Sequence, residues 1–168
     1  MDVNEKIVVE WLNLCKNQFV ISNIPFKVFG PSGGSNYSNI DILSTDSKNN
    51  FYDYEIKWRS VFGIGSTDNK TIYALVNQLS RKERIEKIKE IIGEKSYKKI
   101  LVTTKTFLGK SDKKRNMFIS KFKDNGIGVI FFNDIIQELV SAVHKLGRYD
   151  SQVLQIIRMI KQMKIKLD

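Results

Sequence analysis

Three charged residues lie inside two short apolar segments of the sequence. Asp41 stands between two isoleucines, and Glu55 and Lys57 stand two residues apart in the next apolar run. A charge inside an apolar strand is costly unless a partner or a metal ion holds it there. Two carboxylates on neighbouring strands can hold Mg²⁺, and a nearby lysine can stabilise negative charge in a transition state. The residues therefore predict metal-dependent hydrolysis, for which a phosphodiester is a fitting substrate.

The context of these residues, rather than the acid-x-lysine triplet, carries the prediction. The same triplet also begins at three other acids, which fall in a turn, a polar loop and a helix start: Asp46, Asp68 and Asp112. Only Glu55 and Lys57 lie within an expected strand that follows another strand with a single internal acid. Alternation along that strand places four charged residues on one face: Asp53, Glu55, Lys57 and Arg59. On an inert sheet such a face is commonly solvated, and the competing interpretation is a polar cleft. Asp53 has no assigned role in either.

The apolar pattern predicts the elements that must position these residues. Helical spacing is found over 3–17, over 70–92 with a break near Ser80, over 113–124, over a segment running to Lys145, and over 151–166. Strands are expected over 26–29, 40–44, 51–59, 99–104 and 128–132, and the second and third form a hairpin around the turn 46–50. Early strands should pair antiparallel, and later strands joined by helices should pair parallel. The expected fold is α/β, with a mixed central β-sheet flanked by α-helices in a single domain, 1–168.

The composition of the chain limits the classes of partner and cofactor that we expect. The formal net charge is +10, which favours a polyanion such as nucleic acid, although a lysine-rich surface is the alternative. No apolar run approaches the ~20 residues of a membrane span, so we expect a cytoplasmic protein without a membrane partner. Cys15 and His144 are each the single residue of their type, which excludes an internal disulfide and a cysteine- or histidine-rich zinc site. The glycine-rich loop 30–35 lacks the ending of a P-loop, so no nucleotide cofactor is expected.

The strand motif resembles that of the PD-(D/E)XK nuclease superfamily, which has the restriction-endonuclease-like fold. The resemblance covers about residues 3–140 and leaves a C-terminal helical extension, about 147–168, outside it. It implies that Asp41 and Glu55 are the metal-binding acids, that Lys57 is the motif lysine, and that the backbone carbonyl of Ile56 completes the metal site. Glu10 resembles the additional helix acid of some branches, with a catalytic and metal-binding role. The implied cofactor is Mg²⁺, for which Mn²⁺ substitutes.

Two branches of the superfamily compete. The loop 30–35 before Asp41 resembles that of archaeal Holliday-junction resolvases, which act as homodimers, and Ser32 or Ser35 would be its serine. The segments 99–104 and 126–139 are more similar to those of Mrr-like restriction endonucleases. Gln78 stands about where RecB-like nucleases place a helix glutamine, although Lys82 replaces the tyrosine expected four residues later.

The leading hypothesis is a Mg²⁺-dependent DNA endonuclease, either junction-resolvase-like or Mrr-like. The alternative is a non-catalytic nucleic-acid-binding protein on a nuclease fold, and RNA stays open as a substrate. We interpret the charge run 81–90 as a solvated helix face. The last helix either packs in the core or forms the interface of a homodimer. The residues predicted to contact DNA are Lys27, Ser32, Ser35, Arg59, Lys70 and Gln78.

Overall fold

The computed structural model describes residues 2–29, 34–58 and 69–163. For residues 69 and 70 only the backbone is described. Five strands form one open mixed sheet in the order β1-β2-β3-β4-β5. β1, β2 and β3 pair antiparallel, and β3, β4 and β5 pair parallel, which confirms the predicted hairpin and mixed sheet. The bounds of the strands are β1 Phe19–Phe29, β2 Ser35–Thr45, β3 Phe51–Lys57, β4 Tyr97–Thr103 and β5 Ile127–Phe131.

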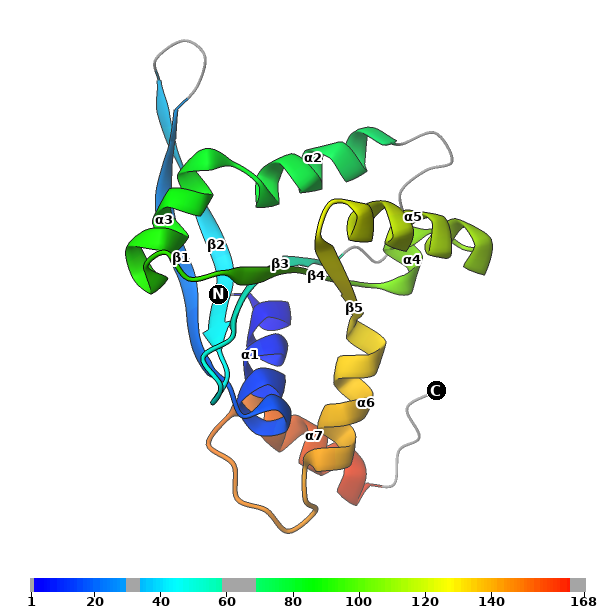
Figure 1. The fold of residues 1–168 in the computed structure, drawn as a ribbon. Helices are drawn as coiled ribbons and strands as arrows, with labels where there is room; N and C mark the ends of the chain where they lie inside the picture. The colour runs from blue at the N-terminus through cyan, green and yellow to red at the C-terminus, as the bar shows by residue number, and fades with distance from the viewer. Residues whose placement is uncertain (1, 30–33, 59–68, 164–168) are drawn as a thin grey trace.

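Helices cover both faces of the sheet (Figure 1). One face packs against α1 (Val3–Lys16), α6 (Phe132–Ala142) and α7 (Gln152–Gln162). The other face packs against α2 (Asn69–Leu79), α3 (Lys82–Ile92), α4 (Lys105–Leu108) and α5 (Asp112–Asp124). The predicted break near Ser80 is confirmed, because α2 ends just before this residue and α3 begins just after Arg81.

β1 is much longer than the predicted strand 26–29. The apolar pattern is interrupted by Ser22, Asn23 and Pro25, and Asn23 has a positive φ of 56°. β1 is an edge strand of the sheet. A proline is tolerated at such an edge because one side of the strand needs no ladder partner.

The two faces of the sheet differ in how their apolar clusters are divided and in whether charged residues are buried among them. A single apolar cluster lies between α1, α6, α7 and the sheet, with Tyr54 and Ile56 of β3 in it. Two smaller clusters lie on the opposite face, one under α2, α4 and α5 and the other between α3 and the β1–β2 hairpin. Asp53 and Glu55 are fully buried on this second face, so charged groups are enclosed in the same layer as two apolar clusters.

α7 packs on α6 and α1 with part of its apolar stripe. Leu154 and Ile157 are buried, and the ammonium of Lys161 donates to the carbonyls of Val140 (2.6 Å) and Val143 (2.7 Å) at the end of α6. This helix therefore belongs to the core. Ile156 and Met163, which the sequence places on the apolar stripe, are exposed, as is Met159. Across the described ranges, no helix is both long enough and apolar enough to cross a membrane.

Candidate active site

The site forms where β2 and β3 diverge. The paired register of the two strands ends at Ile42 and Tyr54. One residue further, Oδ2 of Asp41 accepts a hydrogen bond of 2.7 Å from the backbone N–H of Ile56. The carboxylate of Asp41 thus accepts the hydrogen bond that a backbone carbonyl would accept in a regular β-ladder. It is held at the opening between the two strands.

The backbone of Ile56 points two groups toward this opening. In an extended strand the N–H and C=O of one residue face the same neighbour. Since the N–H of Ile56 meets Asp41, its carbonyl oxygen faces the same side. The side chain of Ile56 is buried in the apolar cluster on the opposite face, and this packing fixes the orientation of the strand.

Glu55 is the centre of a polar network. Its side chain is 0% exposed, and its Oε1 accepts a hydrogen bond of 2.7 Å from Nε2 of Gln78. The ammonium of Lys57, which is partly exposed, also contacts Oε1. Nη1 of Arg84 donates to Oε2 at 2.7 Å. Three donors, on β3, α2 and α3, therefore orient this carboxylate.

Arg84 corrects the interpretation of 81–90 as a solvated face. It is fully buried, and it donates to Asp53 through Nε (3.0 Å) and Nη2 (2.6 Å). Burial alone would lower the pKa of Arg84, but the hydrogen bonds and charges of Asp53 and Glu55 raise it above its usual value. Asp53, which the sequence leaves without a role, is the bidentate partner of this arginine. Arg84 lies four and eight residues before the buried Ile88 and Ile92, and that spacing was the signal for its burial.

Burial, with a smaller contribution from the charge of the neighbouring Glu55, raises the pKa of Asp41 to about 7. The hydrogen bond from Ile56 and the charges of Lys57 and Arg84 lower it, but they do not compensate. The raised pKa therefore reflects mainly the cost of holding a negative charge away from water. A cation at this position would relieve the repulsion between the two carboxylates.

This pKa leads to a prediction for the metal-free protein. The usual pKa of an aspartate is 3.8, so between 3.8 and about 7 the folded state binds more protons than the unfolded state. The free energy of unfolding should therefore fall as pH rises through this window, by at most about 4 kcal/mol from this group. Asp41→Asn cannot ionise, so its melting temperature in EDTA should rise relative to that of the wild type as the pH is raised from 5 to 8.

Asp46→Asn is the matched control for this experiment. Hydrogen bonds from Asn50 lower the pKa of Asp46 to about 2, so this acid does not titrate between pH 5 and 8. Its effect on the melting temperature should be constant over that range. A difference between Asp41→Asn and the wild type that does not change with pH would contradict the prediction.

Glu5, another acid of α1, lies within electrostatic reach of Glu55. Glu10 lines a hollow beside the start of α7, together with Ser151 and Gln152. Five residues of helix turn through about 140°, so Glu5 and Glu10 point to different sides of α1. Burial raises the pKa of Glu5, Asp2 adds to this effect, and the charge of Glu55 contributes a smaller share. Oε2 of Glu5 is buried and has no hydrogen-bond partner among the described residues, and no pattern in the sequence indicated this unsatisfied oxygen.

The oxygens at this site fit a hard divalent cation. Within the described part of the chain, no group of three or more His, Cys, Asp or Glu side chains is placed to hold a metal ion. Mg²⁺, however, is commonly bound through one or two carboxylates and keeps several waters. Asp41, Glu55 and the carbonyl of Ile56 would supply such a partial set, and Asp41 accepts a single hydrogen bond from the described residues.

The residues predicted to contact DNA do not lie in one place. Lys27 and Ser35 are exposed on the β1–β2 hairpin. Gln78 is instead part of the network around Glu55. Ser32 and Arg59 lie outside the described residues, and so does the side chain of Lys70, whose backbone belongs to α2.

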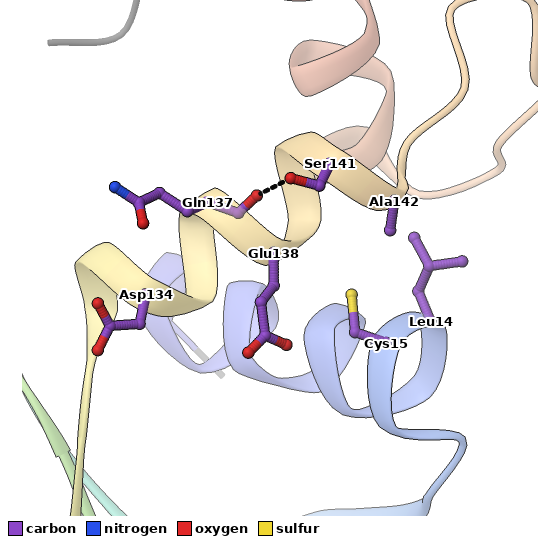
Figure 2. A pocket seen from close by; sticks show the side chains of 7 residues that line it. All are labelled: Leu14, Cys15, Asp134, Gln137, Glu138, Ser141 and Ala142. Atoms are coloured by element: carbon purple, nitrogen blue, oxygen red, sulfur yellow. Dashed lines mark hydrogen bonds between the residues drawn. The ribbon is translucent and has the colours of Figure 1, made fainter.

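A hollow between α1 and α6 is the main alternative location for chemistry (Figure 2). Its acid, Glu138, accepts a hydrogen bond of 2.7 Å from the indole of Trp11 and contacts Lys16 at 2.7 Å. Burial raises the pKa of the Cys15 thiol, which makes it a poor nucleophile. These side chains hold two helices together on the sheet face opposite to Glu55, and we assign them no chemistry. The lining residues are Leu14, Cys15, Asp134, Gln137, Glu138, Ser141 and Ala142.

No protein-family model matches the chain, and no curated protein sequence matches it. The arrangement of Asp41, Glu55, Lys57 and Arg84 is therefore the basis for assigning a function to this protein.

Proposed function

We propose that the protein is a Mg²⁺-dependent endonuclease that hydrolyses phosphodiester bonds of DNA, on a restriction-endonuclease-like fold. The observation that carries this proposal is the convergence of Asp41 and Glu55 at the opening between β2 and β3. Lys57 forms an ion pair with Glu55, and the backbone N–H of Ile56 donates a hydrogen bond to Asp41. The formal net charge of +10 supports a polyanionic substrate. A homodimer, which would suit the cutting of two strands, is part of the same proposal.

Each residue has a distinct task in this proposal. Asp41 and Glu55 would hold the cation with the Ile56 carbonyl, and bound Mg²⁺ would supply a water of lowered pKa and polarise the phosphate. Lys57 is partly exposed beside the fully buried Glu55, so its ammonium can reach the phosphoryl oxygens or the attacking water. Gln78 and Arg84 fix the orientation of Glu55 and leave its carboxylate little freedom to rotate.

Cleavage of a DNA panel tests the proposal. The panel contains a four-way junction, a flap, a single strand, a linear duplex and a methylated duplex, each with Mg²⁺, with Mn²⁺ or with EDTA. We expect metal-dependent cleavage of at least one substrate and none in EDTA. Paired nicks in the junction would favour the resolvase-like branch, and cutting of only the methylated duplex would favour the Mrr-like branch. Cleavage that persists in EDTA would contradict the proposal.

One observation favours a non-catalytic nucleic-acid-binding protein as the second candidate. Arg84 and Lys57 bring two positive charges to Glu55, so this carboxylate is neutralised without a metal ion. Calorimetric titration with Mn²⁺ separates the two candidates. A site that is present in the wild type and absent in Asp41→Asn supports the nuclease. DNA binding that weakens steeply with salt, without any metal site, supports the second candidate.

A further inference from the structure

One face of the β1–β2 hairpin carries two exposed aromatic side chains beside a lysine. Phe29 is 65% exposed and Tyr37 is 71% exposed. Lys27 is the cross-strand partner of Tyr37, and Ser35 is the partner of Phe29. Since cross-strand partners lie on the same face and residues two apart share it, these four side chains form one surface. We call it the arm face, and it also includes the exposed pair Pro25 and Asn39.

The arm face is not needed for packing within the described chain. The opposite side of the same hairpin already provides the buried contacts, through Ile24, Phe26 and Ile40 against α3. The hairpin also extends beyond α3, away from the centre of the sheet (Figure 1). Two large aromatic rings with a lysine between them are thus presented to solvent on a projecting element.

β2 carries part of the arm face and also Asp41. Asn39 is two residues before Asp41 in the same strand, and Tyr37 is four residues before it. At about 3.3 Å per residue, the Cα atoms of Tyr37 and Asp41 are separated by roughly 13 Å. A strand whose phosphate is placed at Asp41 can therefore reach Tyr37 within a few nucleotides.

We propose that the arm face binds unpaired bases of a nucleic-acid strand beside the phosphodiester that is cleaved. This inference rests on the proposed function and specifies its substrate class. Exposed aromatic rings stack on bases of any sequence, and Lys27 is placed to contact the phosphates between them. In a regular duplex the base faces are covered by their neighbours, so stacking requires a single strand, a flap or a junction. The arm face would thereby select structure rather than sequence.

Fluorescence anisotropy with labelled DNA in EDTA tests this inference without cleavage. The probes are a single strand, a flap and a blunt duplex of matched length. Tyr37→Ala and Phe29→Ala should each weaken binding of the single strand and the flap by about fivefold or more, the loss expected for one stacked base. Tyr37→Phe keeps the ring and should bind as the wild type does. Duplex binding should change less than twofold.

Phe19→Ala is the matched control. Phe19 is 77% exposed on the same strand, ten residues from Phe29 and roughly 33 Å away along it. This variant should bind every probe as the wild type does. The inference is overturned if the arm variants bind the single strand as tightly as Phe19→Ala, or if they lose the duplex and the single strand equally. A fall in molar mass by light scattering in the arm variants would assign this face to a second copy of the chain and also overturn it.

The outcome does not depend on cleavage. If the wild type cleaves DNA and the arm variants keep their affinity for the single strand, the binding role of the arm face is refuted and the nuclease proposal is not. If the wild type cleaves no substrate and the arm variants lose affinity for the single strand, the nuclease proposal is refuted and the binding role of the arm face is not.

Discussion

Asp41→Asn should reduce the rate of DNA cleavage in Mg²⁺ by about a thousandfold or more. The amide is a weaker ligand for a hard cation, and a loss of about 4 kcal/mol of transition-state stabilisation corresponds to this factor. The hydrogen bond from Ile56 can be kept by the amide oxygen, so the fold should be retained. Single-turnover cleavage of the best substrate from the DNA panel measures the effect.

Asp112→Asn is the control for this experiment. Asp112 begins another acid-x-lysine triplet of the chain, but it is exposed at the start of α5. This variant should cleave as the wild type does. Wild-type rates in Asp41→Asn, with its folding verified by circular dichroism, would show that the site has been assigned wrongly.

Arg84→Met should lower the free energy of unfolding by about 3–5 kcal/mol. The substitution leaves Asp53 and Glu55 buried without their main counter-charge, and breaking a buried ion pair from one side has a cost of this size. In a protein of this length the melting temperature should fall by roughly 6–20 °C. Arg84→Lys keeps the charge but loses the bidentate geometry, so its melting temperature should lie between those of the methionine variant and the wild type.

The matched control is Arg81→Met, three residues away on the exposed side of the same helix start. It should change the free energy of unfolding by less than about 0.5 kcal/mol. The double variant Asp53→Asn with Arg84→Met should recover part of the loss, because it removes one of the uncompensated charges. Equal melting temperatures of Arg84→Met and Arg81→Met would refute the buried network.

Local patterns were sufficient to predict most elements of the fold. The hairpin around 46–50, the mixed pairing and the break near Ser80 follow from turn residues and apolar periodicity, which act over a few residues. β1 was largely missed because its polar residues and Pro25 are tolerated only at the edge of a sheet. That position is a property of the whole fold and not of the segment.

The candidate site was predicted only in part. Alternation placed Asp53, Glu55 and Lys57 on one face, but the partner of Asp53 comes from a helix 31 residues later in the chain. The segment 81–90 contains many charged residues, and its charge pattern alone does not show which of them contacts Asp53. On α1, Glu5 was missed, because the apolar stripe shows which side of a helix is buried but not which groups of other elements lie next to that side.

The edge position of β1 also limits how two copies of this chain could assemble. An open edge strand of 11 residues invites pairing with a second sheet, which often leads to aggregation. Pro25 lacks the N–H that such pairing needs, and Lys27 adds a charge to the same edge. A continuous sheet that joins two copies through β1 is therefore disfavoured. For a dimer built from side-chain contacts instead, the exposed Ile156, Met159 and Met163 of α7 and its C-terminal end provide apolar surface.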